Sequence, residues 1–417
     1  MNPWPLVLAD LRSNRAGTLA TLLLVALAVA LGIAVSAQDR ALRAGSAHAA
    51  AGFPLIVGAP GSETQLVLST VYLQPAAIGL VPPAVLAELQ QTRTAKLVAP
   101  IGFGDSWRGH PVVGVTADFV RHLGGGAPAE GVPFGRIDEA VAGADVPLAL
   151  GDGLQPTHGT AGPRPTDSHP FTYRVVGRLP RLGNPWDRAI LVPIEAVWWI
   201  HSLPVGHVLD EVLLYPDGPD GDPDWSAIPL GPPWAEGELA GVPAIVVAPS
   251  SPAAGYQLRQ RYRGQGETTA VFPSEVLLKL YRTLGDVRDL VAAISFLTQV
   301  LVLGAVLLAV LAGLAQRRRR IAVLRALGAS RGYVFAALWL GVALVLVVGS
   351  LLGLVLGYLA ARYLSHLFAA RTALTLPVTL SASELLLLLA IILVGLLLAM
   401  VPAALGYRAP VAANLRG

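Results

Sequence analysis

Histidine is the residue type in this sequence with the clearest chemical potential, as a metal ligand or an acid–base group. The chain has eight histidines and no cysteine, which excludes disulfides, thiolate catalysis and cysteine-ligated metal centres. His158 and His169 share a loop, and His201 and His207 lie near each other, but no HExxH or similar metal-ligand spacing appears. The pattern leaves a metal site open and favours surface or capping roles for these histidines.

The sequence contains no P-loop for ATP. That motif needs Gly-Lys-Ser/Thr, and both lysines, Lys96 and Lys279, are followed by leucine. If ATP drives this protein, the nucleotide and its Mg²⁺ are therefore held by a partner.

Residues 328–332 match the hydrolase motif G-x-S-x-G formally, but an arginine-rich helix stands where a nucleophile elbow needs a strand. We expect Gly328 to end that helix and Ser330 to cap the next one, and we expect no catalytic residue.

A cluster of arginines without any acidic residue separates two long apolar runs. Four arginines at the centre of a membrane helix would cost roughly 10–14 kcal/mol, so the membrane helix should end near Gln316. Three apolar residues about three apart form one face of a short basic amphipathic helix within 317–332. Such a helix is suited to bind a soluble partner protein. The residues expected to contact it are Arg317, Arg318, Arg319, Arg320, Ile321, Leu324, Arg325, Leu327 and Gly328.

The composition indicates an integral membrane protein. The chain is 54% hydrophobic and only 14% charged, whereas a soluble domain carries about 25% charged residues. A net charge of +3 gives no reason to expect nucleic-acid binding. Four runs reach the roughly 20 residues needed to cross a bilayer. We expect transmembrane helices at 17–37, at the end of 274–316, at 333–361 and at 385–404.

The charges that flank these runs predict their orientation. Arg12 and Arg15 precede the first run, and the arginine cluster follows the second. The positive-inside rule then places residues 1–16, 317–332 and 405–417 in the cytoplasm and leaves 38–273 and 362–384 outside. Val35-Ser36-Ala37 resembles a signal-peptidase site, but the run before it exceeds the usual 7–15 or so residues, which favours a retained span.

The sequence of the outer segment, 38–273, predicts an α+β domain rich in turns. Strands are expected at 66–72, 112–116, 172–176, 189–192, 211–215 and 244–247, and helices at 83–91 and 194–201. A further helix should begin at Ser274, which can cap it, and run as a stalk into the second span. The competing interpretation is a short domain helix followed by a linker.

Gly349, Gly353 and Gly357 recur every four residues in the third run. Small residues at this spacing let another helix approach closely, within this subunit or from another. The runs carry almost no ionisable residue, and Glu384 sits at the edge of the fourth. Because proton-coupled transporters place such groups within their spans, this argues against a self-powered transporter.

Together these segments resemble the FtsX/MacB family of bacterial ABC transporter permeases. Residues 317–330 look like the family's RRREIxxLRALGAS loop, and 402–416 look like its PAxRAxRxxPxxALR ending. Residues 10–15 resemble its NLxRNxxR segment before the first span. The outer segment resembles its MacB-like periplasmic core domain, notably at 55–62 and 173–187.

The resemblance implies four transmembrane α-helices, with a large α+β extracytoplasmic domain between the first and second, in a bacterial inner membrane with both termini cytoplasmic. It implies a dimer with a second permease copy or paralogue, two separate P-loop ABC ATPase subunits, and mechanotransmission that moves the periplasmic domain. A periplasmic partner protein is left open. Arg320 stands where the family often has an acid, so a contact made through that acid does not carry over.

Two other functions compete with a permease subunit that has no enzyme activity of its own. One is a membrane-anchored sensor or scaffold, whose outer domain binds a ligand and whose arginine loop recruits a signalling protein. The other is a membrane hydrolase, which ranks last because no triad or metal constellation is recognisable. A neighbouring reading frame that encodes a P-loop ATPase would favour the permease.

Overall fold

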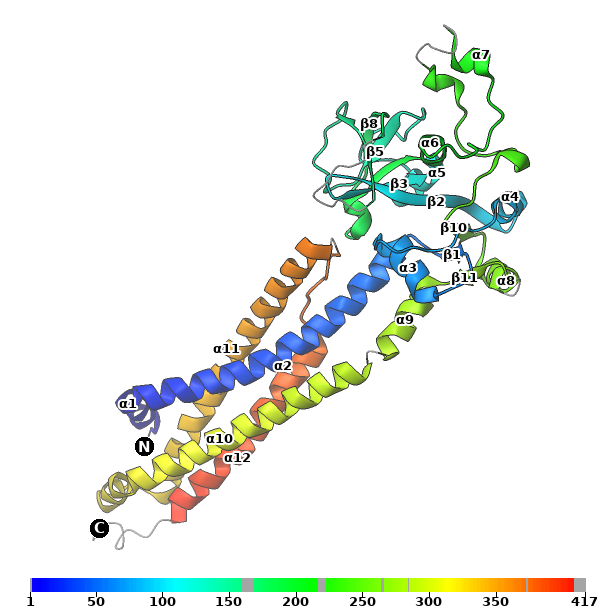
Figure 1. The fold of residues 1–417 in the computed structure, drawn as a ribbon. Helices are drawn as coiled ribbons and strands as arrows, with labels where there is room; N and C mark the ends of the chain where they lie inside the picture. Colours follow the sequence, from blue (N-terminus) through cyan, green and yellow to red (C-terminus); the bar gives the residue numbers. More distant parts are fainter. Residues whose placement is uncertain are drawn as a thin grey trace. The chain divides into compact units, whose positions relative to one another are not determined.

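The computed structural model describes residues 2–159, 169–216, 223–263, 266–283, 285–372 and 374–408 (Figure 1). The chain divides into two compact units. A helical unit comprises Met1–Arg43, Leu284–Leu367 and Leu376–Gly417, and a sheet unit comprises Ala44–Thr283 and Phe368–Thr375.

The helical unit is built from long apolar helices. The long helices are α2 (Arg15–Ala50), α10 (Gly285–Ala326), α11 (Arg331–Thr372) and α12 (Ala382–Arg408), and a short helix, α1 (Trp4–Ser13), precedes them. Three described stretches are long and apolar enough to cross a membrane: Arg15–Ala50, Arg331–Ala370 and Ala382–Val401. In α10 the described apolar stretch, Ala292–Ala305, is shorter, so the predicted second span remains a prediction.

The arginine cluster lies in the same helix as the predicted second span. A separate short helix after Gln316 was expected, and that expectation is wrong, because α10 continues through the arginines to Ala326. No glycine or proline interrupts this stretch. Gly328, at φ +94°, then ends the helix in a Schellman motif, in which the Ala329 N–H donates to the Leu324 carbonyl at 3.0 Å.

Ser330 caps the next helix, as expected. Its Oγ accepts a hydrogen bond from the Tyr333 N–H at 3.2 Å, which satisfies one of the free backbone donors at the start of α11. The turn between α10 and α11 is therefore fixed by two local signals that are readable in the sequence.

The core of the helical unit joins α2, α11 and α12. Val25, Val29 and Ile33 of α2 are buried against Leu346 of α11 and Leu388 of α12, and residues of α10 pack at the edge of this cluster. Leucines on the other helix faces are exposed, among them Leu27, Leu359 and Leu386. Apolar residues exposed along long helices are what a lipid-facing surface requires.

The sheet unit contains one mixed sheet in the order β11-β1-β10-β2-β3-β9-β5-β8-β4, with β6 paired to β8 and β7 to β2. The pairs β3–β9 and β5–β8 are parallel, and the others are antiparallel. The strands are β1 (Leu55–Gly58), β2 (Ala95–Trp107), β3 (His110–Val115), β4 (Glu130–Gly131), β5 (Glu139–Ala142), β6 (Gly153–Leu154), β7 (Thr157–His158), β8 (Tyr173–Arg178), β9 (Ile190–Pro193), β10 (Ala244–Pro249) and β11 (Thr269–Val271).

Short helices connect and cover these strands. They are α3 (Glu63–Tyr72), α4 (Pro83–Gln91), α5 (Ala117–Leu123), α6 (Ile194–Ile200), α7 (Glu211–Leu214), α8 (Pro252–Arg263) and α9 (Pro273–Thr283), with single 3₁₀ turns at Pro185–Arg188, Trp225–Ala227 and Glu236–Glu238. Since α9 ends at Thr283, α10 begins at Gly285 and Leu284 lies outside the described residues, the continuous stalk remains a prediction.

Most expected elements of the sheet unit are confirmed: β3, β8, β9 and β10 among the strands, and α4, α6 and α9 among the helices. Two expected strands are wrong. Residues 66–72 belong to α3, where Ser62 Oγ caps the Gln65 N–H at 3.2 Å, and 211–215 begin with α7, where Asp210 caps the Val212 N–H at 2.9 Å. In both cases a polar cap just before an apolar run favours a helix over the strand that its β-branched residues suggest.

Two glycines set the position of α6. Gly102 of β2 and Gly114 of β3 are cross-strand partners beneath this helix. A Cβ on Gly102 would lie 2.7 Å from Ile194 Cδ1, and one on Gly114 would lie 2.6 Å from Val197 Cγ2. Side chains at these two positions would push α6 away, so the glycines allow α6 to pack directly on β2 and β3.

Glu195 of α6 is a buried carboxylate within this packing. Its Oε1 accepts hydrogen bonds from the Gly231 N–H and from Trp234 Nε1, both at 2.8 Å. Burial, only partly offset by these hydrogen bonds, raises the pKa of Glu195 from 4.5 to about 7. The folded state therefore binds this proton more tightly than the unfolded state does.

The first prediction concerns pH. Because the pKa of Glu195 is raised on folding, its contribution to stability is fully present below pH 4.5 and is lost as pH rises to about 7. Glu195→Gln mimics the protonated acid, so it should stabilise the protein relative to wild type at pH 8, by up to about 3 kcal/mol, and leave stability at pH 4.5 almost unchanged.

The measurement is thermal unfolding of the full-length protein in detergent, followed by tryptophan fluorescence at both pH values. Equal melting temperatures for wild type and Glu195→Gln at pH 8 would contradict the assignment.

Candidate functional site

The expected partner-binding segment forms the last turns of α10 and the turn that follows. The backbone of Arg317–Arg320 and Ile321 is helical, and their side chains lie outside the described residues. Leu324 is half-buried, whereas Leu327 is 81% exposed. Val323, which the sequence analysis did not select, is also exposed and lies one turn before Leu327 on the same helix face. This end of α10 therefore presents apolar side chains to its surroundings.

The three glycines expected to admit a neighbouring helix face α2 of the same chain. A Cβ on Gly353 would lie 2.6 Å from the Ala26 carbonyl oxygen, and one on Gly357 would lie 2.7 Å from that of Ala30. A Cβ on Gly349 would lie 3.0 Å from Val25 Cβ. The backbones of α2 and α11 are thus in close contact over two helical turns, which only glycine permits.

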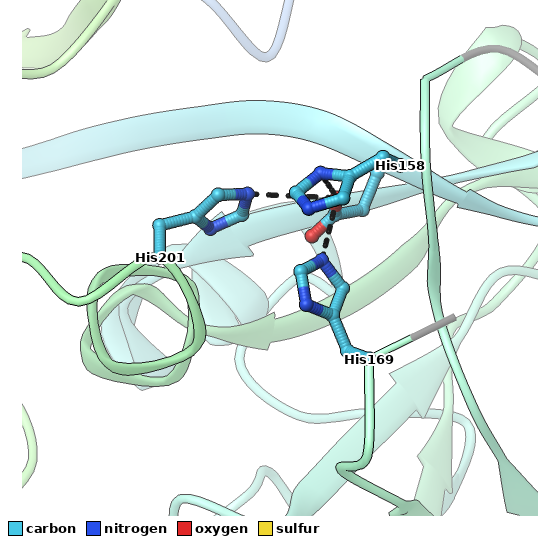
Figure 2. Close-up of side chains that lie close together, drawn as sticks. His158, His169 and His201 are labelled. Atoms are coloured by element: carbon cyan, nitrogen blue, oxygen red, sulfur yellow. Dashed lines mark hydrogen bonds and ion pairs between the residues drawn. The ribbon is translucent and has the colours of Figure 1, made fainter. Parts of the chain in front are cut away.

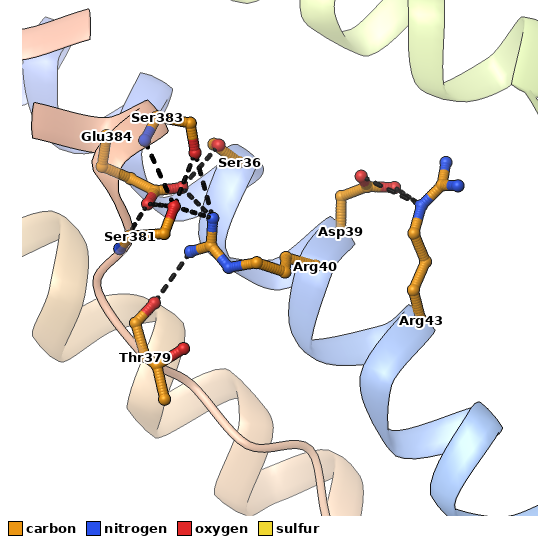
Figure 3. Close-up of polar contacts among 8 residues, drawn as sticks. All are labelled: Ser36, Asp39, Arg40, Arg43, Thr379, Ser381, Ser383 and Glu384. Carbon is orange, nitrogen blue, oxygen red and sulfur yellow. Dashed lines mark hydrogen bonds and ion pairs between the residues drawn. The ribbon is translucent and has the colours of Figure 1, made fainter. Parts of the chain in front are cut away.

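A buried carboxylate ties α2 to the start of α12, and the sequence analysis did not identify this tie (Figure 3). The side chain of Glu384 is 0% exposed, and its Oε1 pairs with Arg40 Nη1 at 2.7 Å. Ser36 Oγ donates to the same oxygen at 2.7 Å, and Ser381 donates through its backbone N–H and hydroxyl to Oε2 at 2.9 and 2.8 Å. Arg40 Nη2 donates to the Thr379 carbonyl at 2.8 Å.

A sequence signal for this tie does exist. Arg40 follows the first apolar run and Glu384 precedes the fourth, so opposite charges occur at ends of two helices that share one membrane face in the predicted topology. A carboxylate that accepts this many hydrogen bonds is fixed in position and has a structural role. Its pairing with an arginine compensates the cost of its burial.

Histidines of the sheet unit gather in a way that their spacing did not suggest. The structure brings His158, His169 and His201 together around Asp105, whereas His207 does not belong to the group. The expected roles hold in part, since His201 is the C-cap residue of α6 and His158 is 49% exposed, but the clustering itself was not expected. Burial, the largest cause, lowers the pKa of His169 below its usual value.

Most of the chain after residue 291 matches a known family model. Residues 292–411 match the family model described as FtsX-like permease C-terminal. The matched range begins in α10, includes the turn at Gly328 and all of α11, and extends beyond the described end of α12. Residues 1–291 lie outside it.

Comparisons with other proteins add less. No curated protein matches the chain. The periplasmic region of MacB from Actinobacillus actinomycetemcomitans aligns with a TM-score of 0.33 and 10% identity, over 55% of this chain and 94% of that one. The extracellular domain of the noncanonic ABC-type transporter YknZ from Gram-positive bacteria aligns with a TM-score of 0.28 and 9% identity, over 52% of this chain and 98% of that one. The MacB-like core domain expected at 38–273 therefore stays a prediction.

The family expected from the arginine segment and the C-terminal ending is nevertheless the one whose model matches. Residues 292–411 of the chain are therefore similar to the C-terminal domain of FtsX-like permeases.

Proposed function

We propose that this chain is the permease subunit of a bacterial ABC transporter, in which a separate subunit hydrolyses ATP with Mg²⁺. The observation that carries the proposal is the FtsX-like permease match over 292–411, which includes the arginine segment. The absence of a P-loop in the sequence supports a separate ATPase. The chain itself acts as a non-catalytic membrane subunit.

The proposed topology follows from charge. The arginine segment stays on the cytoplasmic side of the inner membrane, together with both termini, and the sheet unit lies in the periplasm. Lipid contacts the exposed leucines of the long helices, and a second permease copy or a paralogue completes the dimer.

Helix α10 is the proposed element of force transmission. It is continuous from Gly285 to Ala326, so the predicted second span and the arginine segment form one rod. A helix of this kind transmits displacement along its length because its backbone hydrogen bonds resist extension. An ATPase that closes on ATP would bias the permease only if it binds one position of this helix end more tightly than another.

Helix α2 is the proposed second element. It packs on α11 through the glycine contact and is tied to α12 through Glu384 and Arg40. It also continues past Arg43, the last residue of the helical unit in this stretch, to Ala50. Movement within the helical unit therefore reaches the sheet unit through a helix, and the work done there is export or extraction of a periplasmic or membrane substrate.

The second prediction concerns partner binding at the end of α10. Leu327→Glu and Val323→Glu place a charge on an exposed apolar surface and should greatly reduce co-purification of the ATPase without affecting folding, because both side chains are already exposed. The readout is affinity purification of the full-length chain from its native host, with the ATPase quantified by mass spectrometry.

Val208→Glu is the matched control, since Val208 is equally exposed but lies in the sheet unit. Undiminished ATPase recovery with Leu327→Glu would count against the proposed docking surface. Recovery of a signalling protein in place of an ATPase would favour the sensor or scaffold.

The third prediction concerns the contact between α2 and α11. Gly353→Ala inserts a methyl group against the Ala26 carbonyl and should destabilise the protein by about 1–3 kcal/mol, as overpacking does elsewhere. Gly341→Ala is the control on the same helix, because among the described residues the nearest atom to a Cβ there is Val7 Cγ1, at 3.9 Å. This second change should be neutral or stabilising, given the better helix propensity of alanine. Thermal unfolding in detergent compares them, and equal effects of the two changes would disprove the close contact.

A further inference from the structure

Four segments of the sheet unit place their side chains around one point (Figure 2). Asp105 lies on β2 and is the direct cross-strand partner of His158 on β7. His169 precedes β8, and its backbone N–H donates to the Pro156 carbonyl at 3.1 Å, which draws it toward β7. His201 is the C-cap residue of α6, which the glycines of β2 and β3 hold against the sheet.

A bulge in β2 directs Asp105 into this group. The register between β2 and β3 shifts between Phe103 and Asp105, and Gly104, in between, has φ +154°. Such a bulge changes the direction of the side chain that follows it. The surrounding backbone is well fixed, since the Gly159 N–H donates to the Gly104 carbonyl at 2.7 Å and Ser106 Oγ donates to the Gly159 carbonyl at 2.6 Å.

Three imidazole nitrogens face a single carboxylate oxygen. Asp105 Oδ1 lies 3.3 Å from His158 Nδ1, 3.4 Å from His169 Nε2 and 3.7 Å from His201 Nε2. These distances exceed those of charge-assisted hydrogen bonds, which are about 2.7–2.9 Å. They are close to the edges of a tetrahedron, about 3.3–3.4 Å, that ligands at about 2.0–2.1 Å from a zinc ion define.

The protonation of His201 shows why a cation fits between these groups. His201 Nδ1 lies 2.7 Å from the Val197 carbonyl, which can only accept, so Nδ1 carries the proton. In the neutral ring Nε2 then presents a lone pair toward the carboxylate of Asp105. Metal-bound histidines are commonly oriented in this way, with the second ring nitrogen donating to a backbone carbonyl.

Protonation of all three histidine rings would not make their contacts with the Asp105 carboxylate favourable. The ring centroids of His158 and His169 are 4.0 Å apart, and each is 5.1–5.2 Å from that of His201. Three imidazolium ions at this spacing around one carboxylate would repel one another strongly. A single divalent cation between the four groups satisfies the lone pairs and the carboxylate together.

Two buried oxygens, one in the group and one on a tyrosine that the charge of Asp105 acts on, lack a hydrogen-bond partner within the described part of the chain. Asp105 Oδ2 is one, although the side chain of Asp105 is only 2% exposed, and the hydroxyl of Tyr173 is the other. A buried carboxylate oxygen left without a donor is costly, and a bound cation is one partner that removes this cost.

We propose that Asp105, His158, His169 and His201 form a binding site for a divalent transition-metal ion, of which Zn²⁺ fits best. Imidazole and carboxylate donors suit zinc and its neighbours, whereas Mg²⁺ and Ca²⁺ require mainly oxygen ligands. Four protein ligands complete a tetrahedral zinc shell and leave no position for a reactive water. The ion therefore has a structural role, because it cross-links α6, β2 and the segments around β7 and β8.

The test uses the full-length protein, purified in detergent through a histidine-free tag and stripped with a chelator. Zinc is titrated in competition with a chromophoric chelator, and thermal unfolding is measured with and without Zn²⁺. We expect one high-affinity ion per chain and a zinc-dependent rise in melting temperature that Mg²⁺ and Ca²⁺ do not reproduce.

Substitutions assign the site. His158 is 49% exposed and His201 is partly exposed, so His158→Gln and His201→Gln should fold normally. Each should weaken zinc binding by more than about 100-fold, because loss of an outer-shell partner alone costs about 10–100-fold. His122→Gln, at an exposed histidine outside the group, should bind like wild type. Absence of stoichiometric zinc binding in the wild type, or unchanged affinity in both site variants, would overturn the proposal.

Discussion

The hydrocarbon core of a bilayer does not tolerate unpaired charge, and this constraint determines most of the helical unit. It places the arginines of α10 outside the membrane, and it explains why the long helices expose leucine. At the start of α12 a buried charge is paired: Glu384 is buried against Arg40, and three serines surround the pair. The proposed orientation of the chain follows from the positive-inside rule, which also concerns the placement of charge.

Packing within the helical unit depends on the absence of side chains as much as on their presence. The glycines of α11 allow its backbone to touch that of α2, and the branched residues Val25, Val29 and Ile33 fill the space beside them. In a lipid environment, where burial of apolar surface gains little, such close contact is a main source of helix association. The proposed movement of the permease therefore involves α2 and α11 as a pair.

The sequence was most informative where a local rule decides the structure. The turn between α10 and α11 was predictable because Gly328 ends one helix and Ser330 caps the next, and the glycine spacing in α11 indicated a helix contact. The helices at 66–72 and 211–214 were not predicted, because their β-branched residues favour strands and only the caps, Ser62 and Asp210 respectively, indicate a helix.

The histidine group could not be predicted from spacing. Asp105 and His201 are 96 residues apart in the chain, and they meet only because the β2 bulge turns Asp105 and because Gly102 and Gly114 let α6 approach. Ligand spacing in a sequence identifies sites built on one element, whereas this site is assembled from four. Arg40 and Glu384 are likewise far apart in the chain, and only tertiary packing brings the two helix ends together.

The measurement that tests the central claim most directly is the sidedness of the α10–α11 turn. The chain has no cysteine, so Leu327→Cys and Val208→Cys each introduce a single thiol. The account predicts that a membrane-impermeant maleimide labels Val208→Cys in intact spheroplasts and labels Leu327→Cys only in inverted membrane vesicles. Labelling of Leu327→Cys in intact spheroplasts would place the arginine segment outside the cell and contradict an ATPase-coupled permease.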